Sequence, residues 1–299
     1  MSAQELAQLR GLLSQGGIDF SADPVVERVN FDGMFGSFPK DETLVTTAKE
    51  FGGVPGLWAD GERGVLLYLH GGGYTLGSAK AYEQFAASLA RSADVALFSV
   101  DYRLAPEHPY PAAIDDAVAA YRGLLAGGIP STDIVIVGDS AGGGLTLAAL
   151  VALRDAGEAL PSAAVVLSPF ADLTFSGGSM TGKAERDPAL TESGLRDAAA
   201  HYLQGADPST PSASPVFAEL LGLPPLLVEV GQDEILLSDS VRIAERAAEN
   251  GVDVTLHVWP TMIHDWAVFS FMLSEGRDLI DEVGAWVRSR LAAVTGEGA

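Results

Sequence analysis

The sequence predicts an α/β fold, in which a mostly parallel β-sheet is covered on both faces by helices. Two observations predict it: short uninterrupted apolar runs recur along the chain, and stretches with helical periodicity separate them. A strand that is apolar at every position fits a sheet buried on both faces. Alternation with helices is typical of parallel strands joined by crossover helices. The 299 residues allow one large domain of this kind or two small ones.

The apolar runs and the periodic stretches fix the expected elements in order. The predicted strands are Val65–Leu69, Val95–Val100, Ile134–Val137, Ala164–Leu167, Leu226–Val230 and Val254–Trp259. The predicted helices are Tyr82–Arg91, Ala112–Leu125, Gly143–Leu153, Ser240–Glu249 and Leu279–Val294. In a sheet built this way, functional sites lie at the carboxyl ends of the strands.

The first forty residues fall outside this alternation. Their leucines, Leu6, Leu9, Leu12 and Leu13, fit one face of a short helix. An irregular apolar stretch follows over residues 20–38. We expect residues 1–45 to form one half of a cap over the site.

A long insertion also breaks the alternation. More than fifty residues separate Pro169 from the strand that begins at Leu226, and they include a predicted helix around Leu190–Leu203. Loops of this length without a role are uncommon. We therefore expect residues 46–299 to form a catalytic domain, with the second half of the cap inserted at about 171–215.

Composition excludes several classes of protein. The chain has 18 Lys and Arg against 40 Asp and Glu, and a formal net charge of −22 argues against nucleic-acid partners and anionic lipid. It contains no cysteine, which excludes disulfides, a cysteine nucleophile and cysteine-ligated zinc. No apolar run reaches the ~18 residues of a membrane span. Glu5 and Arg10 stand where a signal peptide would be apolar. We expect a cytoplasmic protein without stable membrane insertion.

A serine motif follows the third predicted strand. Ile134–Val137 runs directly into Gly138-Asp139-Ser140-Ala141-Gly142, and a predicted helix comes next. A serine on a sharp strand-to-helix turn sits in a strained conformation, and the residues two positions away must be small. The N-terminus of the following helix favours negative charge that develops at the reacting centre. We expect Ser140 to be a nucleophile; a tight packing turn is the structural alternative.

An activated serine needs a base, and the base needs an orienting acid. Among the five histidines, His264 comes just after the last predicted strand, at the end of the sheet where Ser140 lies, and is the expected base. Asp233 follows the preceding strand and is the expected acid, with Glu234 and Asp239 as rivals. The order nucleophile, acid, histidine is that of the α/β-hydrolase fold. Because the base must be neutral, activity should rise with pH near ~6.5.

A glycine-rich loop follows the first predicted strand, as His70-Gly71-Gly72-Gly73-Tyr74. Three glycines let the backbone approach a substrate closely and turn N–H groups toward it. We expect an oxyanion hole here, completed by the N–H of Ala141.

Five segments together resemble the GDSAG branch of the bacterial hormone-sensitive-lipase family of esterases. They are HGGGY, Asp101–Ala113, Gly138–Gly143, GQDEILLSDS and PTMIHDW. The resemblance covers about residues 60–290 and implies an α/β-hydrolase core with a helical cap. It implies hydrolysis of short- to medium-chain acyl esters through an acyl-enzyme, without cofactor or metal. It also implies oxyanion donors at the N–H groups of Gly72, Gly73 and Ala141. Asp233 matches the first Asp of the family's D-x-x-x-x-x-D stretch.

Other functions are compatible with these residues. A lactone hydrolase would use the same triad, as would an amidase or acyltransferase. Plant hormone receptors resemble this family but lack a working base and only bind a small molecule; here all three catalytic residue types are present. The expected partner is a small ester, and a homodimer is left open. Five aromatic residues are candidates either to line an acyl pocket or to pack within the cap: Phe20, Phe35, Phe38, Tyr74 and Tyr202.

Overall fold

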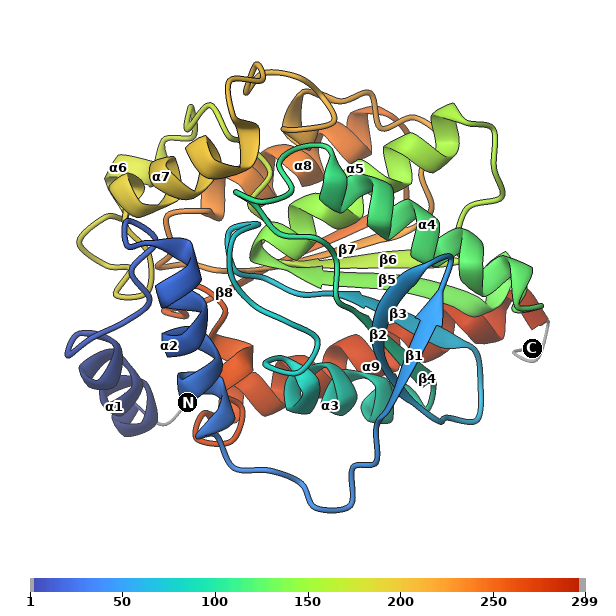
Figure 1. The fold of residues 1–299 in the computed structure, drawn as a ribbon, viewed down its shortest axis with the longest axis horizontal. Helices are drawn as coiled ribbons and strands as arrows, with labels where there is room; N and C mark the ends of the chain where they lie inside the picture. Colours follow the sequence, from blue (N-terminus) through green and yellow to red (C-terminus); the bar gives the residue numbers. More distant parts are fainter. Residues whose placement is uncertain (1–2, 296–299) are drawn as a thin grey trace.

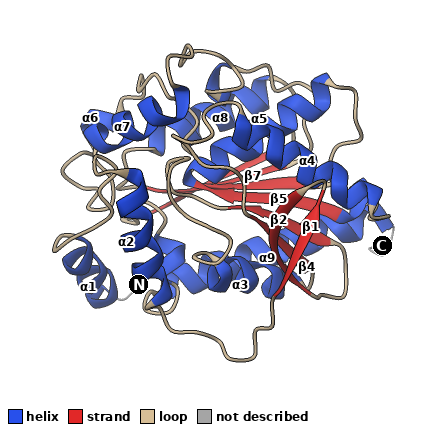
Figure 2. Cartoon of the chain, viewed as in Figure 1, coloured by secondary structure: helices blue, strands red, loops and turns tan. Residues whose placement is uncertain are grey.

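The structure is a computed structural model that describes residues 3–295, and within them one eight-stranded sheet forms the centre of the molecule (Figure 2). The strands are β1 (Thr47–Phe51), β2 (Val54–Ala59), β3 (Val65–Leu69), β4 (Ala96–Val100), β5 (Ile134–Asp139), β6 (Ala163–Leu167), β7 (Leu226–Gly231) and β8 (Val254–Trp259). They lie in the order β1-β2-β4-β3-β5-β6-β7-β8. All neighbours from β4 to β8 in this order are parallel, which confirms the predicted fold class.

Helices cover both faces of the sheet, and each face has its own apolar core (Figure 1). One layer holds α4 (Ala112–Ala126), α5 (Ser140–Asp155) and α8 (Leu237–Glu249), and the other holds α3 (Glu83–Ala93) and α9 (Ser274–Thr295). Strands β3 to β7 are buried at every position, as their uninterrupted apolar sequences predict. The five predicted helices are confirmed, although α5 begins at Ser140 instead of Gly143.

The hairpin of β1 and β2 is absent from the sequence-based prediction. Four of the five β1 residues are exposed, so no apolar run marks the strand. Gly52 and Gly53 join the two strands with φ values of 63° and 81°, the conformation of a two-residue hairpin turn. The Gly-Gly pair is the signal that could have located it.

The N-terminal residues form two helices, α1 (Ala3–Leu13) and α2 (Pro24–Gly36). The first was predicted. The second corrects the expectation of an irregular stretch over residues 20–38. Asp23 caps α2 by accepting the N–H groups of Val25 and Val26, and Phe31 and Phe35 stack one turn apart. The Asp-Pro pair before this apolar spacing is a helix-start signal.

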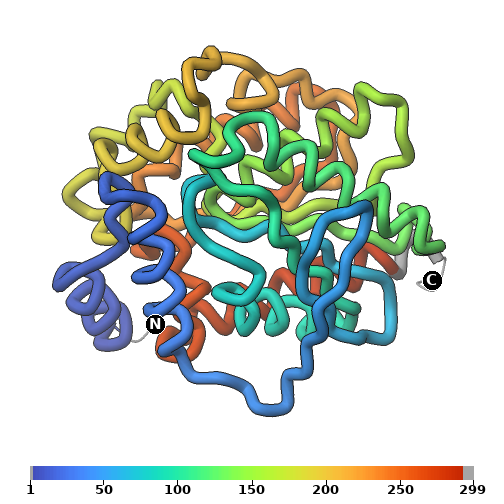
Figure 3. Tube along the Cα trace, viewed as in Figure 1, coloured from blue at the N-terminus to red at the C-terminus, as the bar shows by residue number. Residues whose placement is uncertain are grey.

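The inserted segment contains α6 (Ser179–Gly182) and α7 (Glu192–Leu203), followed by a short 3₁₀ helix at Pro215–Phe217. It lies beside the N-terminal helices at one end of the molecule (Figure 3). The proposed domain boundaries themselves stay a prediction, and their outer ends, residues 1–2 and 296–299, lie outside the described residues. Between residues 3 and 295, no helix combines the length and the apolar character needed to cross a membrane.

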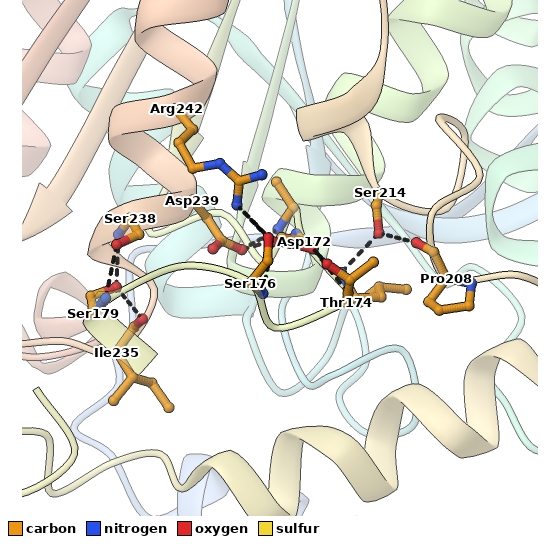
Figure 4. A network of polar contacts seen from close by, with 12 residues as sticks. Asp172, Thr174, Ser176, Ser179, Pro208, Ser214, Ile235, Ser238, Asp239 and Arg242 are labelled. Carbon is orange, nitrogen blue, oxygen red and sulfur yellow. Dashed lines mark hydrogen bonds and ion pairs between the residues drawn. The ribbon is translucent and has the colours of Figure 1, made fainter. Parts of the chain in front are cut away.

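Buried polar contacts hold the base of the inserted segment against α8 (Figure 4). Arg242 pairs with the fully buried Asp172 at 2.6 Å. Asp239 accepts two backbone N–H groups at the start of the segment. The Ser179 hydroxyl donates to the carbonyl of Ile235 at 2.6 Å. These contacts join the segment to the loop that follows β7, next to the residues discussed below.

Candidate active site

Ser140 lies at the junction of β5 and α5, where the chain turns sharply from strand to helix. Its φ is 49°, the strained left-handed conformation predicted from the motif. A Cβ at Gly138 would lie 2.2 Å from the carbonyl oxygen of Gly142, and one at Gly142 would lie 1.9 Å from that of Leu69. These distances explain why both flanking positions are glycine.

His264 faces Ser140 from the loop after β8. Its Nε2 lies 3.0 Å from Ser140 Oγ, and its Nδ1 lies 2.8 Å from Oε2 of Glu234. The other oxygen of Glu234 accepts hydrogen bonds from the Ser168 hydroxyl at 2.8 Å and the Gly231 N–H at 2.5 Å. Hydrogen bonds therefore fix both oxygens of the carboxylate, which is placed to accept a hydrogen bond from Nδ1–H of the imidazole. Serine, histidine and glutamate form one continuous line of hydrogen bonds.

Asp233, the expected acid, lies elsewhere, and this prediction is corrected. Its carboxylate pairs with Arg10 at 3.2 Å, with Arg186 at 3.2 Å and with Lys183 at 3.5 Å. The turn after β7 directs Asp233 toward α1 and the inserted segment, and directs the next residue, Glu234, into the core beside His264. Glu234 has an exposed fraction of 0%, against 9% for Asp233. Of these two adjacent residues, Asp233 pairs with cations and Glu234 contacts the imidazole.

Asp239, the second rival, holds the inserted segment instead. Its carboxylate is buried in the first turn of α8, where burial raises its pKa to about 8. It therefore belongs to the contacts of Figure 4.

The glycine loop after β3 lies against Ser140 at the carboxyl ends of the strands. The Gly71 N–H donates to Oδ1 of Asp139 at 3.0 Å, so this amide is occupied. Gly72 and Gly73 follow with φ values of 111° and 62°, which only glycine adopts without strain. Gly72 lines the same cavity as Ser140. This arrangement leaves the N–H groups of Gly72 and Gly73, with that of Ala141, as the candidate oxyanion donors.

His70, the first residue of this loop, packs against Tyr102. Its ring stacks on Tyr102 with centroids 4.2 Å apart, and the Tyr102 hydroxyl donates to the His70 carbonyl at 2.7 Å. Burial lowers the pKa of His70 to about 4, so the ring is neutral at ordinary pH.

Ser140 and His264 line a half-open cavity of about 70 Å³. Its N-terminal wall is apolar and comes from Leu13, Ile18, Phe20, Phe31, Met34 and Phe35. The inserted segment contributes Ala189 and Leu190. Of the aromatic candidates, Phe20 and Phe35 line this cavity. Phe38 lies on an outer groove, and Tyr74 and Tyr202 stack on each other at 3.9 Å.

Acidic groups surround the imidazole. Burial by itself would lower the pKa of His264, but Asp265 and Glu234 outweigh burial and raise this pKa well above its ordinary value. Burial also raises the pKa of Asp139, and the charge of Asp265 adds to the effect. The rise of activity with pH is therefore expected above the ~6.5 of an ordinary histidine.

A second cluster of titratable residues lies on β7, β8 and α9. Among the described residues, Glu229, His257 and Glu282 bring potential ligand atoms within 4.8 Å of one another. Their contacts already pair them: His257 Nδ1 lies 3.1 Å from Glu282, and the Trp259 N–H donates to Glu229 at 2.5 Å. The cluster is explained as a polar contact between strand and helix.

Known proteins share both the sequence and the fold. The profile of the α/β-hydrolase fold family matches residues 66–268. An acetyl-hydrolase of Streptomyces hygroscopicus is 47% identical over 233 residues, which cover 78% of this chain and 77% of that protein. An esterase of Acinetobacter venetianus is 34% identical over 256 residues, which cover 84% of each chain.

Solved structures extend the match to almost the whole chain. The crystal structure of an esterase from the bacterial hormone-sensitive lipase family is 42% identical, with a TM-score of 0.92, and the match covers 97% of this chain and 99% of that one. An esterase/lipase from an uncultured bacterium matches at 40% identity with the same TM-score, over 97% of this chain and 100% of that one. The chain thus belongs to the α/β-hydrolase fold family, among the esterases of the bacterial hormone-sensitive lipase type.

Proposed function

We propose that this protein is a serine carboxylesterase that cleaves short-chain acyl esters through an acyl-enzyme, with Ser140, His264 and Glu234 as its triad. The observation that carries the proposal is the continuous line of hydrogen bonds, at 3.0 Å from Ser140 to His264 and 2.8 Å from His264 to Glu234. This geometry lets the imidazole take the serine proton while the carboxylate stabilises the resulting cation.

Acylation begins with attack of Ser140 Oγ on the ester carbonyl carbon. The proton of the hydroxyl moves to Nε2 of His264, and the carbonyl oxygen becomes an oxyanion. The N–H groups of Gly72, Gly73 and Ala141 hold this charge; one such donor is worth about 10²- to 10³-fold in kcat. His264 then gives the proton to the alkoxide, and the alcohol leaves.

Deacylation repeats these steps with water. His264 removes a proton from the water molecule, the hydroxide attacks the acyl carbon, and the same N–H groups hold the second oxyanion. The proton returns to Ser140 Oγ when the carboxylic acid leaves. Glu234 keeps the Nδ1–H tautomer throughout, because both of its oxygens are fixed by hydrogen bonds.

The preference for short acyl chains rests on the size of the cavity. A volume of about 70 Å³ corresponds to a few water molecules, which is enough for an acetyl or butyryl group. Residues 13–35 and 189–190 of the lining belong to the proposed cap regions 1–45 and 171–215, and Tyr82, Val268 and Phe269 complete the wall. We infer that these two regions together set the length of the acyl chain.

The first experiment measures release of 4-nitrophenol from the acetate, butyrate, octanoate and palmitate esters, with Ser140→Ala as the matched control. We expect fast turnover of the two short esters and none by the variant. Turnover that survives in Ser140→Ala would overturn the assignment of the nucleophile. A folded wild-type protein that cleaves lactones but none of these esters would overturn the ester assignment while keeping the triad.

A further inference from the structure

Asp265, the residue after His264, places a second carboxylate in the active centre. Its Oδ2 lies 3.0 Å from Nε2 of His264, the same nitrogen that contacts Ser140 Oγ at 3.0 Å. The side chain is only 15% exposed, and it lines the cavity together with Ser140. Its other oxygen, Oδ1, is buried and finds no hydrogen-bond partner among the described residues.

The contact between Asp265 and His264 bears on whether Nε2 of the imidazole carries a proton. Glu234 accepts a hydrogen bond at Nδ1, so a neutral imidazole of the working tautomer carries a lone pair on Nε2. A lone pair and a carboxylate oxygen at 3.0 Å repel each other, whereas a proton on Nε2 makes the imidazole a cation and turns the contact into an ion pair. The contact with Asp265 therefore favours an imidazolium over a neutral imidazole.

We propose that Asp265 keeps a proton on Nε2 of His264 in the resting enzyme, and that this proton must pass to a base in the solvent before Ser140 can be activated. The inference rests on the proposed function, because it concerns the same base. In this step Nε2 gives one proton to a base in the solvent and the imidazole becomes neutral. Nε2 can then accept the proton of Ser140 Oγ.

Other charged groups face the imidazole, but from different directions. Glu234 follows β7 and contacts Nδ1. Asp139 ends β5, and Asp187 belongs to the inserted segment; both interact electrostatically with His264. Each of these carboxylates favours the imidazolium when it is ionised. Asp265 is the one that contacts Nε2, so its removal should have the largest effect on the proton that blocks catalysis.

A purely structural role explains Asp265 poorly. It precedes the 3₁₀ helix Trp266–Phe269, but its side chain makes no capping hydrogen bond to that helix. Its φ is 50°, a conformation that glycine adopts at no cost. A residue needed only for this turn would gain nothing from a buried carboxylate with an unpartnered oxygen.

The test compares pH profiles of kcat/KM for Asp265→Asn and Asp265→Gly with that of the wild type, from pH 5 to 10. Hydrolysis of 4-nitrophenyl butyrate is followed at the isosbestic wavelength of the product. We expect the acidic limb of both variants to lie about 1 pH unit or more below that of the wild type. Glu245→Gln, an exposed substitution on α8 with the same change in net charge, should leave the limb in place. Coincident limbs in the wild type and both Asp265 variants would overturn the proposal.

A second measurement separates this inference from the ester assignment. Sulfonylation of Ser140 by phenylmethylsulfonyl fluoride needs the neutral base but no ester, so its rate against pH should move in the same way. If the protein cleaves no ester but the sulfonylation limb moves in the variants, the proposed function fails and the role of Asp265 stands. If neither variant folds, ¹⁵N histidine spectra of the wild type decide: a neutral His264 at pH 7 refutes the proposal.

Discussion

Replacing Glu234 with glutamine should nearly abolish catalysis while leaving the fold intact. Glutamine has almost the same shape, and its carbonyl oxygen can still accept the hydrogen bonds from Ser168 and Gly231. Its NH₂ group then faces Nδ1 of His264, at the position where the carboxylate now lies 2.8 Å away. Two donors cannot share a hydrogen bond, so the imidazole moves its proton to Nε2 and turns a donor toward Ser140.

The magnitude follows from this change of tautomer. Amide replacement of the triad carboxylate in a serine protease costs about 10⁴-fold in kcat, or about 5.5 kcal/mol of transition-state stabilisation. Glu234 is fully buried, so no water can take over its role, and we expect a loss of this size. Because ester and serine are otherwise unchanged, KM should change much less than kcat.

Asp233→Asn is the matched control, since it removes one carboxylate from the adjacent position. Asp233 pairs with three cations that are partly exposed, and such pairs are worth up to about 1 kcal/mol each. The variant should keep kcat within about tenfold of the wild type. The assay is hydrolysis of 4-nitrophenyl acetate, with circular dichroism to verify folding. A loss of 10³-fold or more in Asp233→Asn, with Glu234→Gln near wild type, would refute the reasoning.

Two further predictions concern the cavity and the buried acids. Phe20→Ala removes a half-buried ring from the wall beside Gly73 and should raise kcat/KM for the octanoate ester relative to acetate; an unchanged ratio would show that Phe20 does not limit chain length. Burial raises the pKa of Glu229 to about 8. Between about pH 4.5 and 8, Glu229 therefore carries up to one more proton in the folded protein than in the unfolded chain, and its contribution to the free energy of unfolding falls by up to about 1.4 kcal/mol per pH unit. Urea unfolding at pH 5, 6.5 and 8 should give a flatter dependence for Glu229→Gln than for the wild type, and parallel curves would contradict the prediction.

The sequence alone predicted the sheet because its central strands are buried on both faces. A continuous apolar run such as Ile134–Val137 is typical of a strand covered on both faces, and the structure buries every residue of this run. The hairpin of β1 and β2 lies at the edge of the sheet, where exposed residues such as those of Thr47–Phe51 leave no apolar signal. The helix Pro24–Gly36 was missed for a related reason: it covers other helices and loops, and its apolar residues serve both packing and the cavity wall.

At the site, the sequence determined the residues whose chemistry depends on the local backbone. Ser140 stands on a strand-to-helix turn between two glycines, and Gly72 and Gly73 have positive φ, so the local sequence could predict these candidates. Which carboxylate contacts the imidazole depends instead on the direction in which each side chain points. Asp233 and Glu234 are adjacent carboxylates after the same strand, and only the turn after β7 decides which one enters the core and which one meets the cations of Arg10, Lys183 and Arg186.

The electrostatics of the base were likewise decided only by tertiary structure. A sequence places His264 at the end of a strand with Asp265 beside it, but it does not reveal that Asp139, Asp187 and Glu234, from three other parts of the chain, also interact with the imidazole. A proton equilibrium depends on distance and burial, which arise only when distant segments pack together. The proposed nucleophile and base could thus be predicted from local sequence, while the proposed acid and the charges around the base depend on the folded chain.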